Sequence, residues 1–457
     1  MRARRNAYFS VAVITVVGVA LLSGCAGLPP PAERSARADL QATGAALLAR
    51  EGRPALPVLR ADSPPEEFVR YAVLNHPAVA AAYYDWRAGV EDIAPARSLP
   101  EPSLTFEADI TDTLMSFMPG LMFDIMGAGK RAAMGREATA AAGVARRTYL
   151  AVLLNTAAEA RKAWIELAFI EEAIRLRELS AGALGRSRDI ANADYTTGRG
   201  MGSLTDQVRF TNEIAKVQSD LATLSDRRTA GRARFKSALG LAPADPDPAW
   251  PRPVLTPTAL PGEDELWRRA SAANAELGRM RAMVEMAVAG VEVARKTGRP
   301  DFTLGLMADL KADPLMLRPT ASLKLPVWRE KIAATIAAAE ARRDASEARV
   351  TAEQLNLAAE LAQMLYMVRE ADRMIAYIDH TALPNFDRMI ATAEAGYQSG
   401  MAGPAMIPET QLMALGMRLE RAVALRERET AVTGLMLLTA DVVPSDLSAA
   451  PPAANTP

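Results

Sequence analysis

The sequence is poor in the residues that most often carry chemistry. It has one cysteine, Cys25, and two histidines, His76 and His380, in 457 residues. A disulfide within one chain is therefore impossible, and no His-x-x-His spacing or second cysteine supports a zinc site. The sequence also lacks a recognisable nucleophile–base constellation and a glycine-rich phosphate loop after a strand. We therefore expect neither an enzyme nor a protein with a cofactor or a metal centre.

Aromatic residues and excess charge are also scarce. The net charge is −1, and a protein without a basic surface is not expected to bind nucleic acid. Aromatic residues make up 5% of the chain, which is low for a compact enzyme core, whereas alanine is abundant. Small side chains let helices approach each other closely over long distances. The composition favours a bundle of helices with coiled-coil packing.

Proline and glycine are missing from long stretches of the chain. No proline occurs between residues 120 and 242, and neither residue type occurs between Trp328 and His380. A continuous helix over Trp328–His380 would be roughly 80 Å long and must pack lengthwise against other helices. The composition predicts three such partners, over Lys130 to about Ser180, Leu204–Leu239 and Glu409–Ala440.

Between these helices the hydrophobic pattern changes to a period of two. Apolar and polar residues alternate over Ser103–Ile110 and Leu121–Ile125, and again over 301–310 and 321–325. The pattern predicts two hairpins of strands close to the ~9–11 residues that cross a bilayer. Four strands cannot close a barrel, so membrane strands here require several copies of the chain. The predicted fold class is mainly α with a β-barrel part. It combines long antiparallel coiled-coil helices with four membrane strands per chain in a trimeric α/β barrel.

The first residues have the pattern of a bacterial signal peptide. Arg2, Arg4 and Arg5 precede an apolar stretch, Tyr8–Leu22, that is short for a membrane span. The sequence Leu-Ser-Gly-Cys that ends at Cys25 resembles the lipobox of bacterial lipoproteins. The resemblance implies cleavage before Cys25, lipidation of its sulfur and, from the Ala that follows, sorting to the outer membrane.

The two halves of the chain share an order of features. Asn75-His-Pro-Ala, a strand pair, a long helix and Tyr195-Thr-Thr-Gly recur as Asn274-Ala-Glu-Leu, a strand pair, a long helix and Tyr397-Gln-Ser-Gly. This recurrence predicts an internal duplication. The predicted organisation is a signal peptide (1–24), a lipidated tether or surface strap (25–64), a first repeat (65–242), a proline-rich linker (243–261), a second repeat (262–440) and a disordered tail (441–457).

Together these features resemble the TolC-like outer membrane efflux protein family. The resemblance covers roughly residues 65–440 and depends on the Asn-His-Pro stretch, the proline-led strands, Lys324-Leu-Pro-Val-Trp328 and the paired Tyr-x-x-Gly turns. It implies a homotrimer in the outer membrane with a periplasmic helical tunnel, the passive duct of a tripartite efflux system. The implied partners are a periplasmic adaptor (membrane fusion) protein, an inner-membrane transporter and outer-membrane lipid.

The resemblance also implies a periplasmic gate and adaptor contact at the turns that follow each Tyr-x-x-Gly. The corresponding residues are Tyr195, Gly198, Arg199, Ser203, Asp206, Tyr397, Gly400 and Glu409. The sequence departs from the family where Met401-Ala402 stands in place of an arginine, so an arginine–carboxylate lock at this turn is open. Arg199 is a candidate substitute, and helix capping is the competing role for these residues.

A periplasmic helical structural or adaptor lipoprotein without a pore is the competing function, since it would share the anchor and the helices. The role of five methionines, Met115, Met118, Met122, Met126 and Met134, is likewise open. They could bind Cu(I) through their thioethers or could fill gaps in apolar packing. Ducts for drugs, metal ions and proteins share this design, so the sequence leaves the cargo open.

Overall fold

The computed structural model describes residues 29–47, 56–110, 114–197, 204–251, 255–312, 314–399, 401 and 406–444. The chain divides into two compact units, each built from three segments of the sequence. The sheet unit comprises Met1–Gly44, Ala82–Tyr149 and Glu276–Ala352. The helical unit comprises Ala45–Ala81, Leu150–Ala275 and Glu353–Pro457. Each unit therefore combines segments from both halves of the chain.

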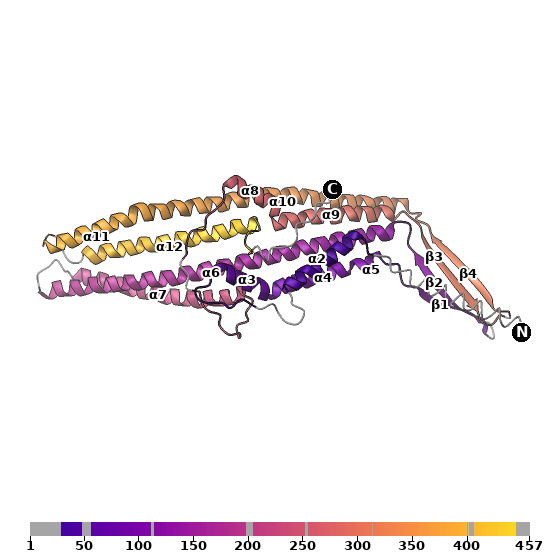
Figure 1. Cartoon of the computed structure of the whole chain (residues 1–457), viewed down its shortest axis with the longest axis horizontal. Helices are drawn as coiled ribbons and strands as arrows, with labels where there is room; N and C mark the ends of the chain where they lie inside the picture. Colours follow the sequence, from indigo (N-terminus) through magenta and orange to yellow (C-terminus); the bar gives the residue numbers. More distant parts are fainter. Residues whose placement is uncertain are drawn as a thin grey trace. The chain divides into compact units, whose positions relative to one another are not determined.

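The elements confirm a mainly helical chain with a small sheet (Figure 1). The helices are α2 Pro31–Leu47, α3 Pro65–Asn75, α4 Pro77–Glu91, α5 Ile93–Arg97, α6 Lys130–Thr197, α7 Leu204–Ala238, α8 Glu263–Ala273, α9 Ala275–Lys296, α10 Arg329–Tyr377, the π-helical turn η1 Ile378–Ala382, α11 Leu383–Gln398 and α12 Met406–Leu438. The strands are β1 Ser103–Ile110, β2 Leu114–Ile125, β3 Asp301–Asp309 and β4 Met316–Lys324. Helix α6 extends beyond its predicted end, and the helix predicted to reach His380 continues through η1 into α11.

The sheet unit contains a four-stranded antiparallel sheet in the order β1-β2-β3-β4 (Figure 1). Each half of the chain supplies one hairpin, and the pairing of β2 with β3, for example Gly120 opposite Met307, joins them. Alternation gives the sheet one apolar face whose side chains are exposed. These are Leu104, Phe106, Leu121, Phe123, Ile125, Phe302, Leu304, Leu306, Leu317 and Leu323. The opposite face carries polar residues such as Thr105, Thr303 and Ser322.

A cluster of polar contacts connects the sheet to the start of α6. The Asp301 carboxylate, at the start of β3, accepts hydrogen bonds from Lys130 Nζ (2.8 Å) and from the backbone N–H of Gly127 (2.7 Å). A Cβ at Gly127 would lie 2.5 Å from the Pro300 carbonyl oxygen, so only glycine permits this approach. These contacts hold the start of the second hairpin next to the end of the first hairpin.

Within the predicted tether, the structure contains a helix that the sequence pattern did not indicate. Helix α2 packs in the sheet unit through Glu33, whose side chain is 1% exposed and accepts hydrogen bonds from Arg37 and Arg97. Tyr83 donates its hydroxyl to the Leu40 carbonyl at 3.4 Å. Because the ion-pair partner Arg97 lies far along the sequence, local composition alone did not indicate that this segment packs.

The helical unit is built around the middle of α6. On one side, Phe68 of α3 and Phe235 of α7 pack with Trp164 and surrounding aliphatic residues. On another, Phe169 and Ile170 of α6 pack against Leu415 and Ala422 of α12. Among the described residues, no helix combines the length and apolar character that a membrane span requires.

Ion pairs connect α6 and α7 along their length. Four arginines of α7 face glutamates of α6, in the pairs Arg227–Glu166, Arg228–Glu171, Arg232–Glu171 and Arg234–Glu159. A fifth pair, Arg177–Asp220, has its charges reversed. Exposed pairs each contribute little to stability, but a one-turn slip would place these charges out of register. The pairs therefore favour one alignment of the two antiparallel helices.

An asparagine in each half binds the end of a long returning helix. Asn75, the last residue of α3, donates its amide to the carbonyls of Leu239 (3.0 Å) and Gly240 (3.2 Å) beyond the end of α7. Asn274, after α8, donates to the Leu438 carbonyl (3.4 Å) at the end of α12. Both hydrogen bonds span 164 residues, and both satisfy carbonyls that a helix end leaves unpaired.

We expect Asn75→Asp to destabilise the helical unit more than Asn75→Ala. Alanine removes the donor, at a cost of about 1–2 kcal/mol, whereas a carboxylate also repels the carbonyl oxygens at the negative end of α7. Thermal unfolding of the purified variants measures the difference. Asn356→Asp, at an exposed position of α10, is the matched control and should unfold as the wild type does. An Asn75→Asp protein as stable as the control would contradict this assignment.

His76 makes the stability of this contact between α3 and the end of α7 depend on pH. Burial lowers the pKa of His76, and a hydrogen bond to the Ser237 backbone only partly opposes this shift. The neutral ring accepts the Ala78 N–H at Nδ1 (3.1 Å), which a protonated ring cannot do. The neutral form is therefore favoured by folding, so this contribution to stability is complete above pH 6.5 and is lost as the pH falls below it.

We expect the melting temperature of the wild type to fall more steeply below pH 6.5 than that of His76→Asn, since asparagine does not titrate. Melting curves between about pH 7.5 and 5 test this. The difference in melting temperature between the two proteins at each pH isolates His76, because all other groups titrate in both. Parallel pH profiles would mean that His76 does not titrate with unfolding.

Candidate functional site

Two inter-helix turns in the helical unit contain the residues predicted at the periplasmic tip. In the first half α6 ends at Thr197 and α7 begins at Leu204, and in the second half α11 ends at Gln398 and α12 begins at Met406. Figure 1 shows the four helix ends together at one end of this unit. We refer to this region as the helix tip.

The turns themselves are only partly described. Gly198, Arg199, Ser203 and Gly400 lie outside the described residues, as does the side chain of Asp206. Cys25 also lies outside the described residues. The lipidation site and the role of Arg199 therefore stay predictions.

The two predicted tyrosines are exposed at the ends of their helices. Tyr195 is 55% exposed near the end of α6, and Tyr397 is 52% exposed near the end of α11. They occupy equivalent positions, each in the last turn of its helix. Exposed aromatic side chains of this kind are available to a partner surface.

The structure brings Glu409 together with an arginine that is absent from the residues predicted from the sequence. Arg209, in the second turn of α7, donates a hydrogen bond to the Glu409 carboxylate in the first turn of α12. The helix dipole favours an acidic residue at this end of α12. The Arg209 guanidinium also lies 4.7 Å from the ring centroid of Phe210. Within the helix tip, an arginine–carboxylate pair therefore connects α7 of the first half to α12 of the second half, with Arg209 as the cation.

A small apolar core supports this pair. Phe210 is buried with Leu184 and Ala191 of α6 and Val217 of α7, and Leu412 of α12 packs against them. Arg186 of α6 adds a hydrogen bond to the Gln411 amide oxygen at 3.1 Å. Helices α6, α7 and α12 are thus held together close to their ends.

Apolar side chains remain exposed on the outer surface of the tip. Leu204 and Val208 of α7 and Met406 and Met413 of α12 are each about half exposed or more. A shallow groove, which we call the tip groove, has a volume of about 430 Å³ on α7 and is lined by Thr205, Val208, Arg209, Asn212, Glu213 and Lys216. Its lining mixes apolar, polar and charged groups, as protein-binding surfaces do.

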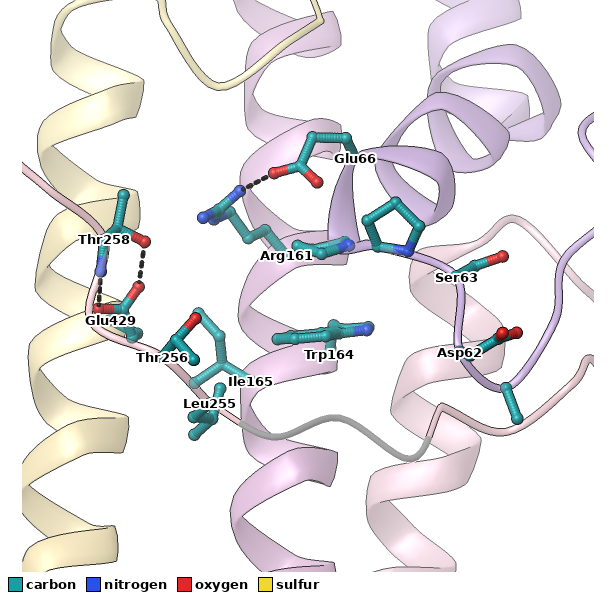
Figure 2. Close-up of a pocket in the computed structure, with 13 residues that line it drawn as sticks. Asp62, Ser63, Glu66, Arg161, Trp164, Ile165, Leu255, Thr256, Thr258 and Glu429 are labelled. Atoms are coloured by element: carbon teal, nitrogen blue, oxygen red, sulfur yellow. Dashed lines mark hydrogen bonds and ion pairs between the residues drawn. The ribbon is translucent and has the colours of Figure 1, made fainter.

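A second hollow, the linker pocket, lies elsewhere in the helical unit (Figure 2). Its volume is about 470 Å³, and it is lined by Arg161 and Trp164 of α6 and by the linker residues Leu255, Thr256 and Thr258. Arg161 donates to Glu66 at 3.1 Å. These residues offer no pairing of a nucleophile with a base, and the pocket supports no catalytic assignment.

One wall of the linker pocket is a buried ionic network that holds the linker in place. The Glu429 carboxylate accepts hydrogen bonds from Thr258 N (3.0 Å) and Thr258 Oγ1 (2.7 Å). Arg428 donates to Glu429 (2.6 Å), to Asp372 of α10 (2.6 Å) and to the Thr258 carbonyl (3.0 Å). Burial opposes the charge of Arg428, but the two carboxylates outweigh it and raise its pKa. The network joins the linker to α10 and α12.

The methionines of the sheet pack closely. Met118 and Met307 are buried, and a Cβ at Gly120 would lie 2.5 Å from Met307 Cγ, so the thioether chain occupies the space above that glycine. Among the described residues, no group of three His, Cys, Asp or Glu side chains could hold a metal ion. The Cu(I) interpretation of the methionines stays a hypothesis.

The second half of the chain matches a family model. Residues 266–441 match the model described as "Outer membrane efflux protein". This match covers most of the predicted second repeat (262–440), and its family is the one that the motifs resemble. The resemblance inferred from the motifs is therefore confirmed. A search of curated protein sequences gave no match.

Solved structures share the fold of this chain. CusC is 15% identical, with a TM-score of 0.69 over 85% of this chain and 98% of that chain. VceC, an outer membrane protein of Vibrio cholerae, is 14% identical, with a TM-score of 0.67 over 82% and 95%. The MtrE outer membrane channel of Neisseria gonorrhoeae, in its open state, is 14% identical, with a TM-score of 0.69 over 86% and 94%. The chain therefore has the fold of these outer membrane proteins, which include channels.

Proposed function

We propose that this protein is the outer-membrane channel of a tripartite efflux system, a passive duct for small molecules. The observation that carries the proposal is the four-stranded sheet. It has an exposed apolar face, a polar face and outer edges on β1 and β4 that no other described strand pairs. In water such a sheet would expose a large apolar area and two template edges. In a bilayer the apolar face suits the acyl chains, provided that the edges find partners.

A trimer supplies those partners. Edge β4 of one copy would pair with edge β1 of the next, so that three four-stranded sheets close a barrel of twelve strands. The apolar face would then meet lipid, and the polar face, with Glu107, Asp109, Asp309 and Lys324, would line a water-filled lumen. The long helices of three copies would continue this lumen as a periplasmic tunnel.

We assign the periplasmic mouth to the helix tip. The Arg209–Glu409 pair would restrain the movement of α12 relative to α7, and Tyr195 and Tyr397 would project at the mouth. The tip groove and its exposed apolar neighbours would contact a periplasmic adaptor protein that connects the duct to an inner-membrane transporter. The transporter would supply the energy, since a passive duct needs only a path and a closable mouth.

We further propose that Cys25 carries a lipid anchor. A single acyl group binds membranes only marginally, whereas a diacylglyceryl group combined with a barrel gives stable attachment. Helix α2, which begins shortly after Cys25 and packs through the buried Glu33, would connect the anchor to the sheet unit. The anchor would thus keep this strap next to the membrane surface.

Planar-bilayer recordings test the channel. The purified full-length protein should produce discrete conductance steps, because a closed barrel of about twelve strands encloses water. Cross-linking before electrophoresis should yield a trimer under the same conditions. Electrical silence of a folded, membrane-inserted protein would instead favour a helical adaptor lipoprotein without a pore.

Charge reversal tests the mouth. We expect Arg209→Glu and Glu409→Arg each to raise the open probability several-fold, because like charges would then face each other, at a cost of roughly 1 kcal/mol. The double variant with exchanged charges should return to the wild-type value. Arg227→Glu, which breaks the Arg227–Glu166 pair farther along α7, is the matched control. Additive effects in the double variant would show that the pair does not restrain the mouth.

A further inference from the structure

A third hollow in the helical unit, which we call the arginine pocket, lies along α6, α11 and α12. Its volume is about 490 Å³, which is within the range of pockets that hold small organic ligands. Three arginines and one glutamate line it together with apolar residues. The charged residues are Glu172, Arg175, Arg418 and Arg421, and Phe169 and Leu425 are among the apolar ones.

The pocket has more positive than negative charge. Arg175 donates two hydrogen bonds to Glu172, at 2.8 and 2.7 Å. Arg421 donates two to Asp379, at 2.7 and 3.0 Å. Within the described residues, Arg418 forms no ion pair. Three guanidinium groups and two carboxylates leave one positive charge, and Arg418 carries it.

The wall of the pocket is apolar and closely packed. Phe169 is 5% exposed, and two further guanidinium groups, those of Arg227 and Arg426, lie 5.3 Å and 4.6 Å from its ring centroid. Leu425 and Ala422 of α12 are buried beside it. These side chains give the pocket an apolar wall.

The π-helical turn η1 positions one side of the pocket. Asp379 lies within η1, and Leu383 follows it directly at the start of α11. The extra residue in a π turn rotates the following helix relative to the preceding one, and such turns are frequent at functional sites. Here η1 places Asp379 next to Arg421, and it places Leu383 at the wall of the pocket.

We propose that the arginine pocket binds a small amphipathic monoanion, with a carboxylate or sulfonate at Arg418 and an apolar body against Phe169 and Leu425. The fork of a guanidinium group matches a carboxylate in two parallel hydrogen bonds. One negative charge balances the pocket, and the volume of about 490 Å³ accommodates an apolar body of the size of a fused ring pair. The inference does not depend on transport, because the pocket lies within one chain.

Calorimetric titration with 1-naphthoate tests the proposal, using the full-length protein in a nonionic detergent. We expect saturable binding, and at least tenfold weaker binding of the neutral analogue 1-naphthalenemethanol. Arg418→Gln should weaken naphthoate binding about tenfold, the equivalent of 1.4 kcal/mol for one charge-assisted contact. Arg418→Lys, which keeps the charge but loses the fork, should fall between them. Arg373→Gln, an exposed arginine on α10 outside the pocket, is the control and should bind as the wild type does.

Three results would overturn the proposal. They are the absence of saturable naphthoate binding, equal affinity for the neutral analogue, and unchanged affinity in Arg418→Gln with its melting temperature preserved. The conductance of the same Arg418→Gln preparation is measured in parallel. Conductance without anion binding by the wild type would overturn the pocket alone, and binding without conductance would overturn the channel alone.

Discussion

A very long helix can bury apolar surface only along its side, and the architecture of this protein depends on that constraint. Helix α6 has 68 residues, roughly 100 Å of length, and its apolar residues do not form one continuous stripe. Different stretches face different partners: α3 and α7 in one region, α12 in the next, and α7 with α12 near the tip. The shorter elements are arranged where each stretch needs a partner.

The ends of these long helices are held by contacts between residues far apart in the sequence. Asn75 and Asn274 bind the C-terminal ends of α7 and α12 over the same separation, which gives the two halves equivalent joints. Arg209 and Glu409 connect the opposite ends across the halves. Side-chain contacts at both ends of α7 and α12 therefore limit how far these helices can slide.

Much of the fold follows from local patterns in the sequence. The absence of proline and glycine predicted the long helices, and the period-two alternation over Ser103–Ile110 predicted the first strand, because both signals depend on neighbouring residues alone. Helix α2 was not predicted, since its burial depends on Arg97, which binds Glu33 from 64 residues away. The turn η1 was also missed, although Pro384 just after it interrupts the regular hydrogen bonding of the helix.

The candidate site was less predictable than the fold. Family resemblance identified Glu409 and the tip tyrosines, but the partner of Glu409 was Arg209 and could be found only in three dimensions. A search of the first two turns of α7 for a cation would have given this candidate. The arginine pocket has no sequence signature at all, because its charged residues come from separate elements, α6, η1 and α12, and leave one net positive charge only when these are brought together.

The pairing of β2 with β3 has a consequence for the order of folding. Gly120 meets Met307 in the centre of the sheet, so the sheet cannot be completed until the second half of the chain has been synthesised. The first hairpin alone is only marginally stable, as isolated two-stranded ribbons are. The apolar face of this ribbon therefore lacks its neighbouring hairpin until nearly two hundred further residues have been made, and a chaperone that shields it would act in this interval.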